Sequence, residues 1–376
     1  MMHVLLIFNK PENLGDLNQC RAVAELLAES FPGSSKTQKV SSAIVRARPR
    51  TRLLFKVLES LGCWKIIGPG GRLDKVFTNL FRTNHGFEER PDVIVSRLPS
   101  SEHAAVALKT WFGVPAILVG HARLLKDSDF DAVITTNEGR VSSNEIVLET
   151  VPTQLTLQNG NTSDPSFNEK EALDVNAPVW CFLVGGGNAA YPYTDRDYRA
   201  WVTFMEQAHQ VLGIRWLIST SRRTSSFAEQ FLRHSLEGTP QLLDATWWHS
   251  GSRKTLRAYI DRAKLCLVTA ESESMLSDCI SFLKPVVGVR PDTAPESVLG
   301  FADQRDQERI ERFLSKVQAR RRAFVCHSSE LEREILEKGR TETVQPLTLA
   351  DRWDKVVKRE LLERGVIEPQ SKRPPA

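Results

Sequence analysis

The sequence predicts an α/β protein with two doubly wound sheets that face a shared central cleft. Three observations support this prediction. The chain has 376 residues, which suggests two domains at roughly 100–200 residues per domain. Short apolar runs of strand length alternate with segments of helical spacing along most of the chain. A polar stretch at residues 158–178 interrupts the alternation, which then starts again.

The composition is that of an ordinary globular chain. Hydrophobic residues make up 41% and charged residues 26%, which excludes wholesale disorder and fibrous repeats. No apolar run approaches the ~20 residues that span a bilayer. The first apolar run is too short for a signal peptide and has no basic lead-in. We therefore expect a cytoplasmic protein, peripheral at most on the inner face of a membrane.

Residues 1–157 are expected to form an N-terminal domain. Its strands are short apolar runs, and its helices carry apolar residues on one face. The expected strands are Val4–Phe8, Val93–Val95, Pro115–Val119 and Ala132–Thr135, and the expected helices are Leu17–Phe31 and Glu102–Trp111. This alternation is typical of a parallel sheet with crossover helices.

Residues 158–178 have the composition of a linker, and residues 179–345 are expected to form a C-terminal domain. Its expected strands are Val179–Val184, Ile214–Ser219, Gln241–Leu243, Leu265–Thr269 and Pro285–Val289. Its expected helices are Asp195–Leu212, Phe227–His234, Leu256–Ala263, Ser274–Phe282 and Gln304–Ala319. Residues 346–376 add a helix at Leu347–Leu362 and a frayed tail.

Positive charge gathers in one part of the first half, although the net charge is only +4. Residues 36–72 contain nine basic side chains and a single acidic one, Glu59, with apolar residues interleaved. Such a basic amphipathic segment can bind an anionic membrane surface, here through residues 46–72. A solvated helix face over the core is the alternative. Nucleic acid is not an expected partner, because the cluster is short and the rest of the chain is close to neutral.

Three polar segments follow strands of the second half, where open α/β sheets bind ligands. The first comprises Gly185, Gly186, Gly187 and Asn188. Glycines at the end of a strand let backbone N–H groups approach a phosphate closely. A tight turn explains the three glycines equally well.

The second polar segment lies at the next strand-to-helix junction. It comprises Ser219, Thr220, Ser221, Arg222 and Arg223. Hydroxyl groups, helix N-terminal amides and guanidinium groups are the groups that hold a pyrophosphate. An N-cap followed by surface arginines is the structural alternative, but it accounts for only one of the hydroxyls.

The third polar segment follows the strand Leu265–Thr269 and leads into a helix. Its candidate binding residues are Thr269, Glu271, Ser272, Ser274, Met275 and Asp278. Asp278 lies one helical turn beyond Ser274 on the same side, and its carboxylate could accept both hydroxyls of a ribose. A capping box is the alternative. Together the three segments predict a site for a nucleoside diphosphate.

The sequences VGGGN, ISTSRRT and VTAESESMLSD, in this order and spacing, resemble motifs of the ELM family, which is named after a mitochondrial fission factor. The family's late motif reads Thr-Ala-Asp-Ser-x-Ser-Met-x-Ser-Glu. Here Glu271 stands in place of the Asp and Asp278 in place of the Glu, which keeps the charges and changes their reach by one methylene. The resemblance is specific over residues 179–290 and weaker elsewhere.

Bacterial members of that family are regarded as glycosyltransferases of the GT-B fold, which has two Rossmann-like domains. The resemblance therefore implies a glycosyltransferase that moves a sugar from a nucleoside-diphosphate sugar to a glycolipid or lipopolysaccharide-type acceptor. The donor would bind the C-terminal half and the acceptor the N-terminal half. Two other functions stay open: a nucleotide-sugar epimerase or hydrolase, and a non-catalytic scaffold or recruitment protein of the same fold.

No cofactor and no metal ion are expected. Helix dipoles and arginines can carry the charge of a leaving diphosphate, and no evident DxD metal motif directly follows an expected strand. The six cysteines form no CxxC pair, which argues against a zinc site or a disulfide framework.

A base that deprotonates the acceptor should lie in the N-terminal half. Asp16, after the first strand, is the best candidate, with His85, His103 and His121 as rivals. In the C-terminal half, the indoles of Trp247 and Trp248 are candidates for stacking on a base or for packing in the core.

Overall fold

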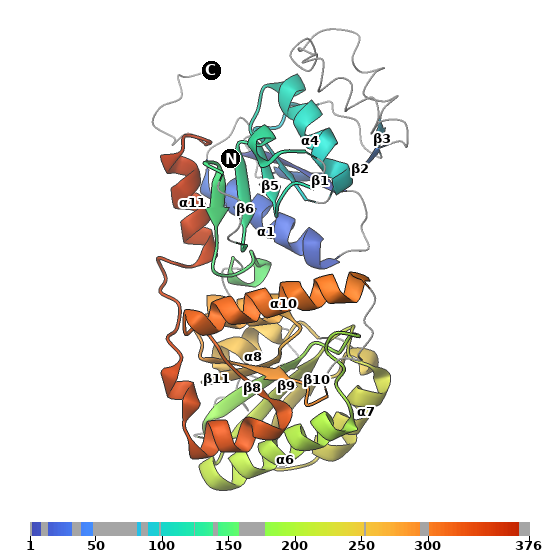
Figure 1. Cartoon of the computed structure of the whole chain (residues 1–376), viewed down its shortest axis with the longest axis vertical. Helices are drawn as coiled ribbons and strands as arrows, with labels where there is room; N and C mark the ends of the chain where they lie inside the picture. Colours follow the sequence, from blue (N-terminus) through green and yellow to red (C-terminus); the bar gives the residue numbers. More distant parts are fainter. Residues whose placement is uncertain are drawn as a thin grey trace. The chain divides into compact units, whose positions relative to one another are not determined.

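Figure 1 shows the protein as a computed structural model. The structure describes residues 2–8, 14–31, 39–47, 81–83, 89–97, 99–123, 125–137, 142–157, 177–251, 253–293 and 301–367. At residues 14–16, 39, 43–47, 81–83, 99–100 and 301–303 it describes the backbone only. The chain divides into two compact units. Unit 1 is Met1–Leu157 with Ala350–Ala376, and unit 2 is Gln158–Leu349.

Unit 1 contains a seven-stranded sheet within the described residues, in the order β3-β2-β1-β4-β5-β6-β7. Neighbouring strands are parallel except for the pair β2 and β3. The strands are β1 (His3–Phe8), β2 (Lys39–Ala47), β3 (Phe81–Thr83), β4 (Val93–Ser96), β5 (Ala116–Val119), β6 (Ala132–Thr135) and β7 (Glu145–Val147). Because the chain winds outward from β1 in both directions, the sheet is doubly wound.

Helices cover both faces of this sheet, namely α1 (Leu14–Ser30), α4 (Pro99–Phe112) and α11 (Trp353–Glu363). Alternate residues of β1 serve the two faces. Val4 and Leu6 belong to the core with α1 and α11, whereas Leu5 and Ile7 belong to the core with α4. Burial on both faces explains why β1 reads as a continuous apolar run. Figure 1 shows α11 beside α1 in unit 1.

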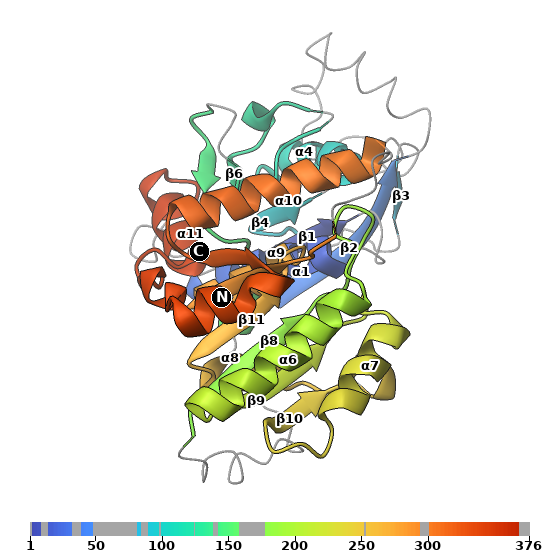
Figure 2. The same cartoon turned by 60° about the horizontal axis from the view of Figure 1, so that its bottom comes forward.

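Unit 2 contains a six-stranded parallel sheet within its described residues, in the order β10-β9-β8-β11-β12-β13. The strands are β8 (Val179–Val184), β9 (Arg215–Thr220), β10 (Leu242–Thr246), β11 (Leu265–Thr269), β12 (Val286–Arg290) and β13 (Phe324–His327). The helices are α6 (Asp195–Leu212), α7 (Ser226–Leu236), α8 (Leu256–Arg262), α9 (Glu273–Ser281) and α10 (Phe301–Ala319). Figure 2 shows α6 along the sheet at β8 and β9.

The strand order of unit 2 reverses between β8 and β11, its topological switch point. One half of the sheet continues from β8 through β9 to β10, and the other from β11 through β12 to β13. In open α/β sheets a ligand binds in the crevice outside the carboxyl ends of the strands at such a point. A ligand site of unit 2 is therefore expected at the loops after β8 and β11 and at the neighbouring loop after β9.

These two sheets confirm the predicted α/β class with two doubly wound domains. None of the strands expected from the sequence corresponds to β2, β3, β7 or β13. Lys39–Ala47, which opens the basic segment, is a strand beside β1. Residues 48–72 and the greater part of the expected linker, residues 158–176, lie outside the described residues. In the described part of the chain, no helix combines the length and apolarity that a bilayer crossing requires.

Candidate functional site

Close packing requires a glycine at each of the three positions after β8: Gly185 packs against the loop after β11, Gly186 against the loop after β9, and Gly187 against its own loop. Gly186 has φ of +108°, in the left-handed region, and a Cβ on it would overlap the backbone of Arg223. A Cβ on Gly185 would overlap the carboxylate of Glu271, and one on Gly187 would lie 2.7 Å from the carbonyl oxygen of Tyr191. Since each glycine is enclosed by a different neighbour, the structure brings the three predicted polar segments together.

Hydroxyl groups fasten these loops to one another. The Thr269 hydroxyl accepts a hydrogen bond from the Gly185 N–H at 2.8 Å and donates to Oε1 of Glu271 at 3.1 Å. The Ser221 hydroxyl donates to the Gly185 carbonyl. The Thr224 hydroxyl donates to the Val184 carbonyl at 2.9 Å. These hydroxyls therefore hold the glycine loop in its shape, and their hydrogen bonds are to protein groups.

Ser219 and Thr220, at the end of β9, face the interior. Ser219 is buried. The Thr220 hydroxyl donates to Oε2 of Glu229 at 2.5 Å and accepts from the Trp248 N–H at 2.8 Å. The Thr220 hydroxyl thus connects β9, α7 and the turn after β10, and its role is to stabilise the packing of these elements.

A cavity of about 290 Å³ lies beside the glycine loop, with all of its lining residues in unit 2. Its polar lining comprises Gly186, Gly187, Asn188, Arg223, Thr224 and Ser225, and its aromatic lining comprises Tyr193, Tyr198 and Trp201. Ser225 is the N-cap of α7 and accepts a hydrogen bond from the Ala228 N–H at 3.1 Å. The positive end of the α7 dipole is therefore at the cavity, which favours an anion there.

Arg223 combines contact with protein and access to the cavity. Its Nη2 donates to the Ser272 hydroxyl at 3.1 Å and lies 3.9 Å from Oε1 of Glu271. Its side chain is still 49% exposed. Arg222 is also exposed, but it is not among the residues that line the cavity. The structure thus separates the two arginines that the sequence treats alike.

Glu271 is a buried carboxyl group at the centre of this arrangement. Burial raises its pKa to about 7, while the charge of Arg223 and the hydrogen bond from Thr269 act in the opposite direction. Its Oε2 has no hydrogen-bond partner in the described part of the structure. Carboxyl groups with such a raised pKa are common at functional sites, and Glu271 is connected to the cavity through Arg223, which lines it.

The remaining residues of the third segment lie at the start of α9. Ser272 is its buried N-cap residue, Ser274 is exposed and Met275 is half-buried. Asp278, one turn further on, retains 7% exposure. Ribose contact by Asp278 stays a prediction.

The aromatic wall of the cavity was missed by the sequence analysis. Tyr193 donates to the Val289 carbonyl at 2.6 Å and accepts from the Ala270 N–H at 3.0 Å, so its ring is fixed between β12 and the loop after β11. Tyr198 and Trp201 come from α6, where their spacing is that of an ordinary core face. No sequence signal distinguishes them from core residues. Thr224, by contrast, belongs to the motif ISTSRRT.

The tryptophan pair after β10 separates into two roles. Trp247 is buried, and its Nε1 donates to Glu237 at 3.0 Å, so it packs in the core. Trp248 is 40% exposed. The neighbouring His249 donates from Nε2 to the Thr224 carbonyl at 2.8 Å, which ties this turn to the loop after β9.

The candidate bases of unit 1 lie in different surroundings. Asp16 is in the first turn of α1, and its side chain and His85 lie outside the described residues. His103 is buried in α4. His121 follows β5 and contacts Asp127 and Glu145. The choice of base therefore stays a prediction.

Two solved structures show which fold this chain has. S. aureus MnaA in a co-structure with UDP has a TM-score of 0.52 and 12% identity, and the match covers 100% of both chains. The UDP-GlcNAc 2-epimerase from Neisseria meningitidis bound to UDP-GlcNAc has a TM-score of 0.50 and 12% identity, and the match covers 96% of this chain and 100% of that one. These likenesses confirm the predicted GT-B-like fold with two Rossmann-like domains.

The family follows from the sequence. The family model described as Mitochondrial fission ELM1 matches residues 15–361, and the chain belongs to this family. The resemblance seen in the three motifs is thereby confirmed over most of the chain. Comparison with curated proteins gives no match.

Proposed function

We propose that the protein is a glycosyltransferase that transfers a sugar from a nucleoside-diphosphate sugar to a glycolipid or lipopolysaccharide-type acceptor. One observation carries this proposal: the cavity at the carboxyl end of the unit 2 sheet joins a glycine loop, the N-terminus of α7 and the Arg223 guanidinium. These three features each favour the negative charge of a diphosphate.

In the proposed complex, the N–H groups of Gly186 and Gly187 and the guanidinium of Arg223 hold the diphosphate. Arg223 and the α7 dipole also stabilise the leaving diphosphate as negative charge develops on it, so the transfer needs no metal ion. Asp278 and Ser274 bind the ribose from α9. Asp16 acts as the base that deprotonates the acceptor hydroxyl.

Unit 1 is the proposed acceptor domain. A glycolipid acceptor would be presented at a membrane surface, and the basic segment 46–72 supplies the attraction to an anionic surface that such a substrate requires. We infer from this a cytoplasmic location, peripheral on the inner face of a membrane.

An epimerase or hydrolase acting on nucleotide-sugars is the second candidate. It is favoured by the similar structure of a UDP-GlcNAc 2-epimerase. A scaffold without catalysis is the third, in keeping with the fission-factor name of the family.

A nucleotide screen followed by product analysis tests the proposal. UDP and UDP-GlcNAc are the first probes, because the similar structures hold them. A ligand at 100 times its Kd should add about 2.7 kcal/mol to the free energy of unfolding, visible as a rise in Tm. Bound nucleotide-sugars are then incubated with lipid extracts, and mass spectrometry identifies the products. A lipid-linked sugar supports transfer, whereas a new nucleotide-sugar isomer or free sugar supports the second candidate. Lack of stabilisation by any nucleotide or nucleotide-sugar would favour the scaffold.

A further inference from the structure

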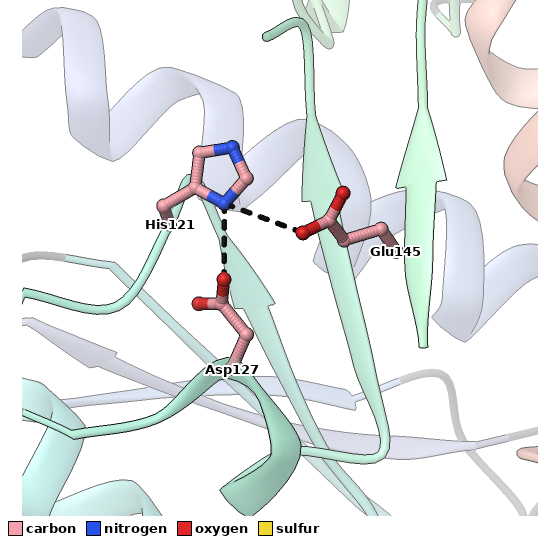
Figure 3. Close-up of side chains that lie close together, drawn as sticks. All are labelled: His121, Asp127 and Glu145. Atoms are coloured by element: carbon pink, nitrogen blue, oxygen red, sulfur yellow. Dashed lines mark hydrogen bonds and ion pairs between the residues drawn. The ribbon is translucent and has the colours of Figure 1, made fainter. Parts of the chain in front are cut away.

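Three polar side chains of unit 1 converge outside the proposed donor site. His121 follows β5, Asp127 opens the 3₁₀ turn Asp127–Asp129, and Glu145 opens β7. Figure 3 shows both carboxylates turned toward the same ring nitrogen of His121. Nδ1 lies 3.2 Å from Oδ2 of Asp127 and 3.8 Å from Oε1 of Glu145. The three atoms all lie within 4.8 Å of one another.

The cluster is largely buried, and one of its carboxylate oxygens has no hydrogen-bond partner among the described residues. The side chains of His121, Asp127 and Glu145 are 17%, 7% and 6% exposed. Oε1 of Glu145 is buried and has no hydrogen-bond partner in the part of the chain that the structure describes. A buried carboxylate oxygen without a partner is costly. A cation held between the two carboxylates and the ring nitrogen would stabilise both carboxylates.

The surrounding hydrogen bonds orient these groups as the outer contacts of a metal site do. Nε2 of His121 lies 3.4 Å from the Asn137 carbonyl, which can only accept, and 3.2 Å from the Thr135 hydroxyl. A proton on Nε2 directs the lone pair of Nδ1 toward the carboxylates. Oδ1 of Asp127 accepts from the Ala122 N–H at 2.8 Å, which holds Oδ2 toward Nδ1.

We propose that His121, Asp127 and Glu145 bind one divalent transition-metal ion, with Zn²⁺ the best match. Imidazole nitrogen and carboxylate oxygen are zinc ligands, and bonds of about 2.0–2.2 Å place tetrahedral ligands roughly 3.3 Å apart. The distances of 3.2 and 3.8 Å from Nδ1 are close to this value. Three protein ligands leave a fourth position for water or substrate. All three ligands belong to unit 1, whereas the residues that line the cavity of the proposed diphosphate site belong to unit 2.

The test measures zinc binding by the full-length chain after removal of metals with a chelator. Titration calorimetry should show one Zn²⁺ per chain. Glu145→Gln keeps the shape of the side chain and removes its charge, and His121→Gln removes the nitrogen ligand. Each should weaken binding at least tenfold. His234→Gln, at an exposed position on α7, is the matched control and should change the Kd less than twofold. Zinc affinity that is absent in the wild type, or equal in all four proteins, would overturn the proposal.

A spectroscopic measurement on the wild type keeps the test decisive if a variant fails to fold. Co²⁺ in the same site should give the intense visible absorption of four-coordinate cobalt, and Zn²⁺ should displace it. Millimolar Mg²⁺ should not displace it, because Mg²⁺ prefers six oxygen ligands. Weak octahedral bands, or displacement of Co²⁺ by Mg²⁺, would contradict a transition-metal site with a histidine ligand.

Discussion

Nη2 of Arg223 lies 3.9 Å from Oε1 of Glu271, so a half-exposed cation in the loop after β9 faces a buried carboxyl group in the loop after β11. The same guanidinium nitrogen donates to Ser272. This pair links two of the three polar segments beside the cavity. Substitutions of Arg223 and of Glu271 therefore test the proposed diphosphate site and the raised pKa.

Replacing Arg223 with Ala should lower the affinity for UDP at least tenfold. Charge-assisted hydrogen bonds contribute about 1.5–3 kcal/mol each, and Arg223 lines the cavity. Arg222→Ala is the matched control and should change the Kd less than threefold. The double variant should remain folded and lose measurable UDP binding in titration calorimetry. An unchanged Kd in the folded double variant would exclude a role for this loop in diphosphate binding.

Glu271 should make the protein less stable as the pH rises. Its pKa is raised by burial from 4.5 to about 7, so between these values the folded state keeps a proton that the unfolded state has lost. The free energy of unfolding therefore falls across this window, by on the order of 3 kcal/mol at 1.36 kcal/mol per pKa unit. Urea titrations at pH 5 and pH 8 measure the change. Glu271→Gln should remove this share of the pH dependence, and equal slopes in both proteins would contradict the raised pKa.

Gly186→Ala should destabilise unit 2 more than a comparable substitution at an open glycine. Gly186 has φ of +108° and its Cβ would overlap the Arg223 backbone, whereas Gly238 has φ of +80° with no atom within 4 Å of a Cβ. Gly238→Ala adds backbone strain alone, roughly 1–3 kcal/mol. Gly186→Ala adds the overlap, which should cost about 1–3 kcal/mol more. Equal urea midpoints for the two variants would show that the loop moves aside freely.

Asp278→Asn should weaken UDP more than inorganic pyrophosphate. The substitution keeps the size of the side chain and removes its charge and one acceptor, and only UDP carries ribose hydroxyls. Titration of both ligands into the variant separates a ribose contact from a general effect. Because Asp278 is buried in α9, equal loss for both ligands would point to a structural role.

The basic segment should attach the protein to anionic vesicles at low salt. Each basic residue near such a surface contributes about 1 kcal/mol, and Leu53, Phe55 and Trp64 can enter the interface. Co-sedimentation should require anionic lipid and fall as salt rises. Substituting Arg48, Arg50 and Arg52 with Ser should reduce it. If the wild-type protein stays in the supernatant with anionic vesicles, the basic segment does not bind membranes and is a solvated surface.

The elements that were predicted best are those whose apolar runs or helical spacing agree with their burial in the structure. The strands β6, β8 and β11 and the helix α6 have their predicted bounds, because apolar runs or helical spacing end there at polar residues or turn residues. The strand β2 was missed, since KVSSAIVRA mixes serines and charges into a strand that is stabilised by its pairing with β1 and β3 and by contact with α4. The strands β7 and β13, with three and four residues, are too short to show a period.

For the candidate site, chain topology was a better guide than side-chain chemistry. Loops after neighbouring parallel strands share one edge of a sheet, so the meeting of the three polar segments could be predicted. The use of their hydroxyls could not, because Thr269, Ser221 and Thr224 bond to the glycine loop in a way that depends on its backbone path. The cluster of His121, Asp127 and Glu145 spans 25 positions without a recognisable spacing, and the pairing of β5 with β6 and of β6 with β7 brings its members together.

The position of α11 has a consequence for the order of events during synthesis. Trp353, Val357 and Leu361 belong to the same core as α1, and Trp353 Nε1 donates to Thr156 at 2.9 Å. Unit 1 therefore lacks part of its core until α11 has left the ribosome, whereas unit 2 is one continuous stretch of chain. Unit 2 can therefore complete its fold before unit 1, whose apolar surface beside α1 stays exposed until α11 packs on it.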